Sequence, residues 1–158
     1  MHIRPYTETD LAAVVQLFTD AIHGLAASHY DAAQRDAWAP QPPDLTRWRE
    51  RVAPLQILVA EEGGTLLGFV GYERSGYIDL MFTSPAAARR GIASRLLARA
   101  QAELQVLGVP KLFTNASLLG RPFFERQGFS VTEEQQISLR GASFRRFSMA
   151  KILTAPAA

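Results

Sequence analysis

Cysteine is absent from the 158 residues, which excludes disulfides, a thiolate nucleophile and cysteine-based zinc or iron–sulfur sites. A strong excess of positive charge is also absent, because 17 Lys+Arg oppose 15 Asp+Glu and leave a formal net charge of +2. Proteins that bind nucleic acids generally are more basic than this. The sequence therefore predicts no metal site and no nucleic-acid partner.

Long apolar runs are missing as well. Glu8 and Asp10 precede the first apolar face, and we find no apolar stretch that approaches the ~18 residues of a membrane span. We therefore expect neither a signal peptide nor a membrane contact, and we expect a cytoplasmic location.

The chain does have enough apolar material for one core. It is 47% hydrophobic and 20% charged, and a single core commonly serves ~100–200 residues. We expect one domain over residues 1–153, followed by a frayed tail at 154–158.

Hydrophobic periodicity predicts a mixed α/β domain, in which a largely antiparallel sheet of six or seven strands is flanked by helices. One long helix is expected after a capping box at Thr7 and Asp10, and another after Pro85. The other expected helices are short, at 32–38, 45–52 and 122–127, and the expected strands are 2–6, 56–60, 66–72, 77–83, 111–115, 129–139 and 144–152.

The loop between strand 77–83 and the second long helix is the most informative segment. A helix N-terminus carries unpaired amides and a partial positive charge, so small residues that enter it can hold a phosphate. Gly91 permits close approach, Ala93 stays small, and Arg89 and Arg90 add full charge. This favours a pyrophosphate site, with a basic loop that binds nothing as the alternative. The lack of a Walker sequence disfavours nucleotide hydrolysis.

Two sequence blocks resemble the GNAT superfamily of N-acetyltransferases, over nearly the whole chain. Residues 81–93, MFTSPAAARRGIA, are similar to the family pattern Leu-aromatic-Val-x-Pro followed by Arg/Gln-x-x-Gly-x-Gly/Ala, and residues 123–129, FFERQGF, to its later block. Residues 28–30, 34–39 and 77–79 add a resemblance to a YafP-like bacterial subgroup. The resemblance implies a GNAT-type fold and acetyl transfer from acetyl-CoA to a primary amine of a small molecule or peptide.

The resemblance also implies where coenzyme A binds. In the family, the strand before the phosphate loop splays from its neighbour and bonds the pantetheine arm through its backbone. A free N–H near Leu80 or Met81 would then face the thioester oxygen, and Asn115 would either bond the pantetheine amides or cap the end of its strand for the following turn. The residues expected to bind the cofactor are Met81, Phe82, Thr83, Arg89, Arg90, Gly91, Ile92, Ala93, Ser94, Asn115 and Phe124.

Two positions depart from the family pattern. Ala88 replaces the usual Arg or Gln, so Arg89 or Arg90 would have to compensate for it in binding phosphate. Phe124 stands where many relatives have the tyrosine that protonates the leaving thiolate. These departures motivate one alternative function, a non-catalytic acyl-CoA-binding or sensor module.

Direct attack by the amine in a ternary complex is the expected mechanism, since no cysteine can form an acyl-enzyme. Asp79 is the first candidate for the base, because a carboxylate in apolar surroundings is a stronger base than one in water. Strand alternation would place it on one face with Tyr77 and Met81, and Tyr77 would act as a relay or acid. The structural alternatives are an Asp79 bonded to loop amides and a Tyr77 that only packs.

Residues 28–54 correspond to the segment that covers the acceptor side in the family. Within it, His29 and Tyr30 would orient or deprotonate the amine, and Trp38 would wall the pocket. An ordinary surface loop and a packing anchor are the alternatives. The exposed edge of the C-terminal hairpin would also allow two copies to pair as a homodimer.

Overall fold

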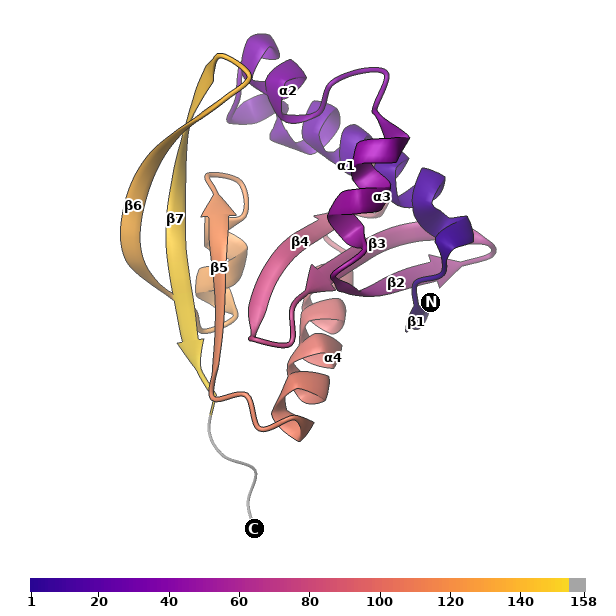
Figure 1. Ribbon diagram of the computed structural model, residues 1–158, viewed down its shortest axis with the longest axis vertical. Coiled ribbons are helices and arrows are strands. Elements are labelled where there is room, and N and C mark those ends of the chain that lie inside the picture. Colours follow the sequence, from indigo (N-terminus) through magenta and orange to yellow (C-terminus); the bar gives the residue numbers. More distant parts are fainter. Residues whose placement is uncertain (154–158) are drawn as a thin grey trace.

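A computed structural model describes residues 1–153, which form a seven-stranded sheet in the order β1-β2-β3-β4-β5-β7-β6 with helices on both faces (Figure 1). The strands are β1 (His2–Pro5), β2 (Gln56–Glu62), β3 (Thr65–Tyr72), β4 (Tyr77–Thr83), β5 (Lys111–Ser117), β6 (Ser130–Leu139) and β7 (Ala142–Ile152). The helices are α1 (Leu11–Gly24), α2 (Ala32–Trp38), α3 (Leu45–Val52), α4 (Ile92–Val106) and α5 (Arg121–Arg126). The predicted tail, 154–158, lies outside the described residues.

These elements confirm the predicted fold class. Observed strands and short helices begin and end within two residues of the predicted ones, because apolar periodicity and turn residues mark them strongly. Every neighbouring pair in the sheet is antiparallel except β4 and β5. The parallel pair follows from the connection through α4, as expected for a crossover helix.

The first helix corrects the prediction about apolar runs. Short 3-10 turns extend α1 at both ends, so Glu8–Ser28 forms a helical stretch of 21 residues with mean hydropathy 1.3, long and apolar enough by length and composition to cross a membrane. Half of it is buried in the protein, and Val14, Val15 and Ile22 are fully enclosed in the core. This packing makes it a core helix of the domain.

The two faces of the sheet carry separate cores. One core gathers around α4, with Leu96 and Leu97 buried against the sheet, and the other gathers around α1. Gly68 of β3 lets α4 lie close, since a Cβ there would come within 3.0 Å of Ile92 Cγ2 and 3.2 Å of Leu96 Cδ1. The first turn of α4 is thereby fixed against the sheet beside β4.

The sheet opens between β4 and β5. Within residues 1–153, their register joins only Tyr77 with Phe113 and Ile78 with Thr114. The buried Thr114 hydroxyl donates to the Ile78 carbonyl at 2.8 Å and fixes the point where pairing ends. Beyond it the two strands continue apart, with β1–β4 in one half of the sheet and β5–β7 in the other (Figure 1).

Candidate active site

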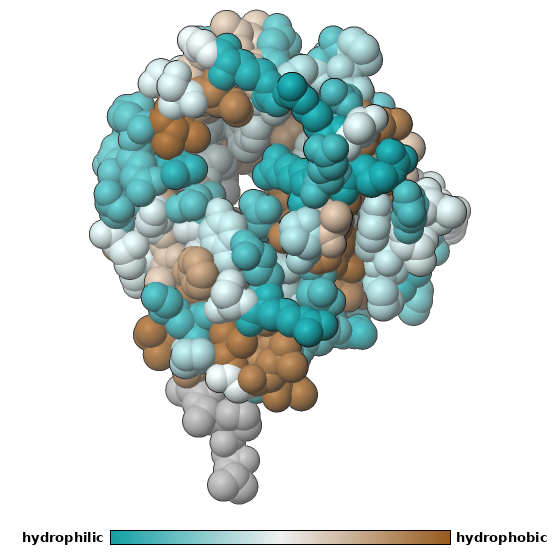
Figure 2. Space-filling view, viewed as in Figure 1, coloured by the Kyte–Doolittle hydropathy of each residue, from teal (hydrophilic) through white to brown (hydrophobic). Residues whose placement is uncertain are grey.

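A cavity of about 690 Å³ lies where β4 and β5 separate. The ends of both strands line it, together with residues of α1, α2 and α3 on one side and of the β6–β7 hairpin on the other. Figure 2 shows the molecule hollowed near its centre, with hydrophilic residues along much of the rim. The cavity therefore lies between elements that are far apart in the sequence.

A β-bulge shapes the cavity wall at β4. The β3 register pairs Gly71 with Leu80 and Tyr72 with Ile78, so Asp79 is an extra residue in β4. A bulge disrupts the ladder locally and bends its strand. The backbone around Asp79 and Leu80 is therefore where the strand departs from regular pairing.

The bulge makes the alternation prediction wrong. Ile78 packs in the core around α4, but Leu80 packs in the core around α1. Residues two positions apart in this part of β4 therefore do not share a face of the sheet. Tyr77 faces away from Ile78, whereas Met81 packs against the α4 core. Tyr77 and Met81 thus project from opposite faces of β4, but both line the cavity, and Asp79 reaches the same cavity through the bulge.

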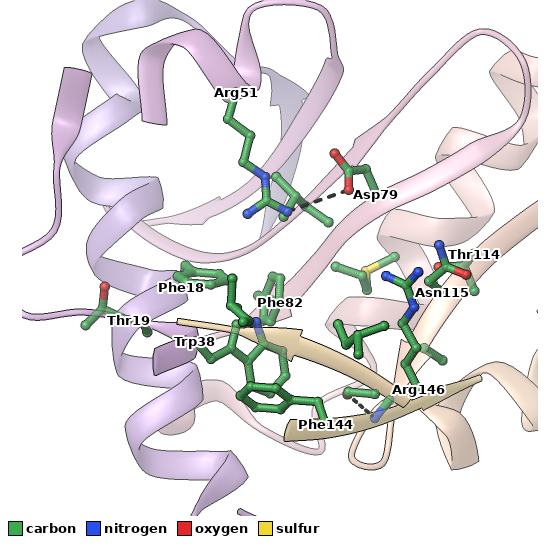
Figure 3. A pocket seen from close by; sticks show the side chains of 18 of the residues that line it. Phe18, Thr19, Trp38, Arg51, Asp79, Phe82, Thr114, Asn115, Phe144 and Arg146 are labelled. Atoms are coloured by element: carbon green, nitrogen blue, oxygen red, sulfur yellow. Dashed lines mark hydrogen bonds and ion pairs between the residues drawn. The ribbon is translucent and has the colours of Figure 1, made fainter. Parts of the chain in front are cut away.

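Asp79 has a charged neighbour at the cavity wall. Its Oδ1 lies 3.6 Å from Nη2 of Arg51 in α3, and the Asp79 side chain is 24% exposed (Figure 3). The Arg51 guanidinium also lies over the Trp48 ring, 5.2 Å from its centroid. The apolar surroundings expected from the β4 sequence are therefore incomplete, because α3 brings a counter-charge to the carboxylate.

Tyr77 lies at the start of the opening and is held by a polar chain. The Asn115 amide Nδ2 donates to the Tyr77 hydroxyl oxygen at 3.1 Å, and Asn115 Oδ1 accepts from Ser148 Oγ at 3.0 Å. Burial raises the pKa of the Tyr77 hydroxyl; Asp79 adds to this increase, whereas the Asn115 hydrogen bond and Arg146 oppose it. Tyr77 is therefore protonated at neutral pH and can donate a proton.

The start of α4 has the open form expected of an anion site. Gly91 is the N-cap in the left-handed conformation, with φ of 76° and no side-chain cap. The first helical hydrogen bond runs from the Arg95 N–H to the Gly91 carbonyl at 3.2 Å. The amides of the preceding turn, at Ile92, Ala93 and Ser94, are those a helix start leaves unpaired.

Several side chains of this loop already contact other residues, so its backbone is more accessible to a ligand than its side chains are. Arg89 is exposed, with φ of 64°, but Arg90 already pairs with Glu62 of β2, Nη2 to Oε2, at 3.0 Å. Ile92 is buried in the α4 core, so it can offer a ligand only its amide. Ser94 Oγ accepts a hydrogen bond from Gln127 Nε2 at 3.1 Å.

Three remaining cofactor candidates lie near the opening. Phe124 is 5% exposed and lines the cavity, edge-on to Phe123 and Phe129. Phe82 lines the cavity and packs on Phe18. Thr83 ends β4 opposite Gly68 and, among the described residues, is outside the lining.

Of the three residues predicted to contact the acceptor, two line the cavity and one does not. Tyr30 and Trp38 line the cavity and pack edge to face, 5.3 Å between centroids. The buried Tyr30 hydroxyl accepts the Leu118 N–H at 2.8 Å, and burial raises its pKa, so it suits a wall better than a base. His29 is exposed, bonds Ser28 Oγ at 2.9 Å and lies outside the cavity lining.

Several residues that line the cavity were not predicted from the sequence, chiefly Arg51, Phe144 and Arg146. They reach the cavity through the packing of α3 and of the β6–β7 hairpin, which periodicity cannot place. The bulge did have a signal, because a glycine inside a strand, here Gly71, often marks one.

Comparison with known proteins decides the family. Residues 26–152 match the model of the acetyltransferase (GNAT) domain. The chain is 36% identical over 152 residues to the uncharacterized N-acetyltransferase YafP of Escherichia coli (strain K12), covering 94% of each chain. The protein belongs to the GNAT acetyltransferase family.

Solved structures of this GNAT fold agree. A GCN5-related N-acetyltransferase from Rhodopseudomonas palustris is 25% identical, with a TM-score of 0.91 over 96% of this chain and 95% of that one. The PaiA N-acetyltransferase of Thermoplasma acidophilum, solved with coenzyme A, shares the fold with a TM-score of 0.76 at 18% identity, over 96% and 98% of the chains. The predicted GNAT resemblance and acyltransferase class are thereby confirmed.

Proposed function

We propose that this GNAT protein transfers the acetyl group of acetyl-CoA to a primary amine by direct attack in a ternary complex. The observation that carries the proposal is the opening between β4 and β5 beside the uncapped start of α4. A thioester carrier needs both an anion site and a groove for its extended arm, and the chain runs from the end of β4 at the opening directly into the loop that starts α4.

The diphosphate of coenzyme A would bind at the start of α4. Unpaired amides and the helix dipole attract an anion there. Gly91 has no side chain to block the anion, and the space beside it is open, because a Cβ at that position would meet no atom within 4 Å. Arg89 and Arg90 would add charge, once Arg90 releases Glu62. The pantetheine arm would lie along Met81–Thr83, like a strand in the opening.

Two side chains have roles in the proposed transfer. Asp79 would take the proton that the amine loses as its nitrogen bonds the thioester carbonyl carbon, and Tyr77 would give a proton to the thiolate as the carbon–sulfur bond breaks. The protonated state of Tyr77 supports this role, which Phe124 cannot fill. A free N–H at the β4 bulge would stabilise the carbonyl oxygen as it gains charge.

The acceptor is proposed to be a small molecule or peptide amine, and the cytosol, which supplies acetyl-CoA, to be the place of reaction. Homodimer formation is supported by β6, an edge strand whose residues are mostly exposed. Its unpaired edge can add a strand from a second copy.

Calorimetry with acetyl-CoA, followed by a thiol-release assay across a panel of amines, tests the proposed function. We expect binding of acetyl-CoA, and amine-dependent release of free thiol for at least one amine. Binding without thiol release from any amine would instead support the acyl-CoA sensor, and an absence of binding would contradict both functions.

A further inference from the structure

Arginine dominates the charge of the cavity. Among the described residues that line it, the acidic side chains are Asp44 and Asp79, whereas the basic ones are Arg47, Arg51, Arg140, Arg145 and Arg146. A cavity with this imbalance repels cationic molecules and attracts anionic ones. The positive charge of the cavity therefore indicates that the acceptor carries a negative charge.

Most of these arginines already have partners that explain them. Arg51 pairs with Asp79 at 3.6 Å, Arg47 with Asp44 at 3.7 Å, and Arg145 with Glu134 at 2.7 Å. Arg140, at the β6–β7 turn, donates to the Ala37 carbonyl at 2.6 Å, which ties the hairpin to α2. Arg146 is left.

Arg146 faces the cavity with its charge uncompensated. It is partly buried in β7, its Nε donates to the neutral Gln135 Oε1 at 2.7 Å, and it forms no ion pair within residues 1–153. It lies opposite Ser117 in the β5–β7 register, two residues from Ser148, which bonds Asn115. Figure 3 shows its guanidinium group extending toward Asn115.

We propose that the acceptor is an amino acid-like amine that also carries a carboxylate, and that Arg146 binds this carboxylate. The inference rests on the proposed acetyl transfer. A planar guanidinium group with free N–H donors matches a carboxylate in a fork, with geometry that lysine does not offer. Asp79, Tyr77 and Arg146 all line the same cavity, so a carboxylate bound by Arg146 leaves the amine of the same acceptor within the space that Asp79 and Tyr77 share.

The charge arrangement also suits the chemistry of an amine. Nearby positive charge disfavours a protonated ammonium group, so it increases the fraction of neutral amine, the form that attacks a thioester. The rest of the acceptor would meet aromatic side chains, since Tyr30, Trp38 and Phe144 pack together in the cavity wall. An acceptor with an apolar side chain between its amine and this wall therefore fits best.

Matched acceptors test the inference. We would measure kcat/KM for L-leucine and L-phenylalanine, for their amides, for the decarboxylated amines isoamylamine and phenethylamine, and for spermidine. The amides have more acidic ammonium groups, so amine ionisation alone favours them over the acids. We expect the acids to exceed the amides at least tenfold, and spermidine to be the poorest acceptor.

Variants assign the preference to one side chain. Arg146→Gln should lower the acid-to-amide ratio at least tenfold, mainly through KM for the acids, and Arg146→Lys should restore part of it. The affinity for acetyl-CoA, measured by calorimetry, should stay unchanged in both variants. The matched control is Arg74→Gln in the exposed β3–β4 turn, and thermal unfolding verifies that each variant is folded.

The outcomes separate the inference from the proposed function. Thiol release with equal rates for acids and amides, a preference for spermidine, or an unchanged ratio in Arg146→Gln would overturn the inference and leave acetyl transfer standing. Acetyl-CoA binding with no thiol release for any amine would overturn both, as would an absence of acetyl-CoA binding.

Discussion

Asp79 owes its position to a single extra residue in β4. The bulge carries its carboxylate to the cavity, next to Arg51 and near Tyr77. Acetyl transfer needs one group that accepts a proton from the amine and another that donates a proton to the leaving thiolate. Asp79 and Tyr77 lie in one cavity but have different neighbours, so they can perform these two opposite transfers. We infer that these two side chains divide the work, with Asp79 as acceptor and Tyr77 as donor of protons.

Replacement of Asp79 by asparagine tests the base. Asp79→Asn keeps the size of the side chain but removes its ability to accept the amine proton, so we expect kcat to fall by about 10²–10⁴-fold. The affinity for acetyl-CoA should change little. Steady-state thiol release across pH, combined with calorimetry, measures both effects, and the acidic limb of the rate profile should disappear.

The control is Asp20→Asn, which removes a carboxylate from the exposed side of α1, where its recorded partner is Gln16 at 2.8 Å. It should retain wild-type kinetics. Full turnover by Asp79→Asn, with an unaltered pH profile, would show that another group removes the proton.

Individual site residues were predictable only where local sequence determines them. Asp79 and Tyr77 stood out as polar groups in an apolar strand, and both line the cavity. His29 was chosen for its chemistry alone, and its loop turns it to solvent. Arg51 and Arg146 could not be found, because their position depends on how α3 and β7 pack against strands distant in sequence.

At the scale of elements, we expect the start of α4 to determine cofactor binding. The helix is held against the sheet through Gly68 and begins without a side-chain cap at Gly91. A ligand anion there would complete hydrogen bonds that the protein leaves open. A phosphate would have to compete with Glu62 for Arg90, because the two side chains form an ion pair. The same contact lowers the pKa of the Glu62 carboxyl.

Charge reversal in the loop tests this site. Arg89→Glu and Arg90→Glu together should weaken coenzyme A binding at least tenfold, about 1.4 kcal/mol, because the phosphates would meet negative charge. Glu62→Gln should have the opposite effect, since it frees Arg90. Calorimetry with coenzyme A measures both.

A single reversal at Arg74, in the exposed turn before β4, changes the net charge half as much as the double variant; it is the control for general charge effects and should have little effect on binding. If the double variant bound coenzyme A as tightly as the wild type, the diphosphate would have to lie elsewhere.

The elements themselves were predictable from local sequence patterns, but the irregularity that opens the sheet was not. Gly108 and Gly128 end their helices in the left-handed conformation, and the short turns fix an antiparallel meander. The opening between β4 and β5 was expected only from the family resemblance, because no local pattern around Leu80 or Asn115 indicates that the strands stop pairing there. The Thr114 hydroxyl donates to the Ile78 carbonyl at the last paired position, and beyond it the two halves of the sheet diverge.

For the whole molecule, the opening makes stability depend on the ligand. The two halves of the sheet share few strand-to-strand hydrogen bonds, so a molecule bound between them would connect both. Any ligand that binds the folded form alone stabilises it, by about 2.7 kcal/mol at 100 times its Kd. Acetyl-CoA at that excess should raise Tm by roughly 5–10 °C for a chain of this size.

Differential scanning calorimetry over a series of acetyl-CoA concentrations measures this shift, which should grow with the logarithm of concentration. The Arg89→Glu and Arg90→Glu double variant should show a smaller shift at equal concentration. A Tm that does not respond to acetyl-CoA in the wild type would contradict binding between the halves.

The interrupted pairing of β4 and β5 also bears on how such a protein can diversify. The backbone N–H and C=O groups exposed where β4 and β5 separate do not depend on the identity of the side chains beside them. A binding site formed by these backbone groups therefore tolerates mutation of those side chains. The walls contributed by α3 and by the β6–β7 hairpin have no such constraint. We therefore expect that new acceptor preferences can evolve, or be engineered, by exchanging wall residues, while the backbone of β4 and of the start of α4, with Arg89 and Arg90, continues to bind the thioester donor.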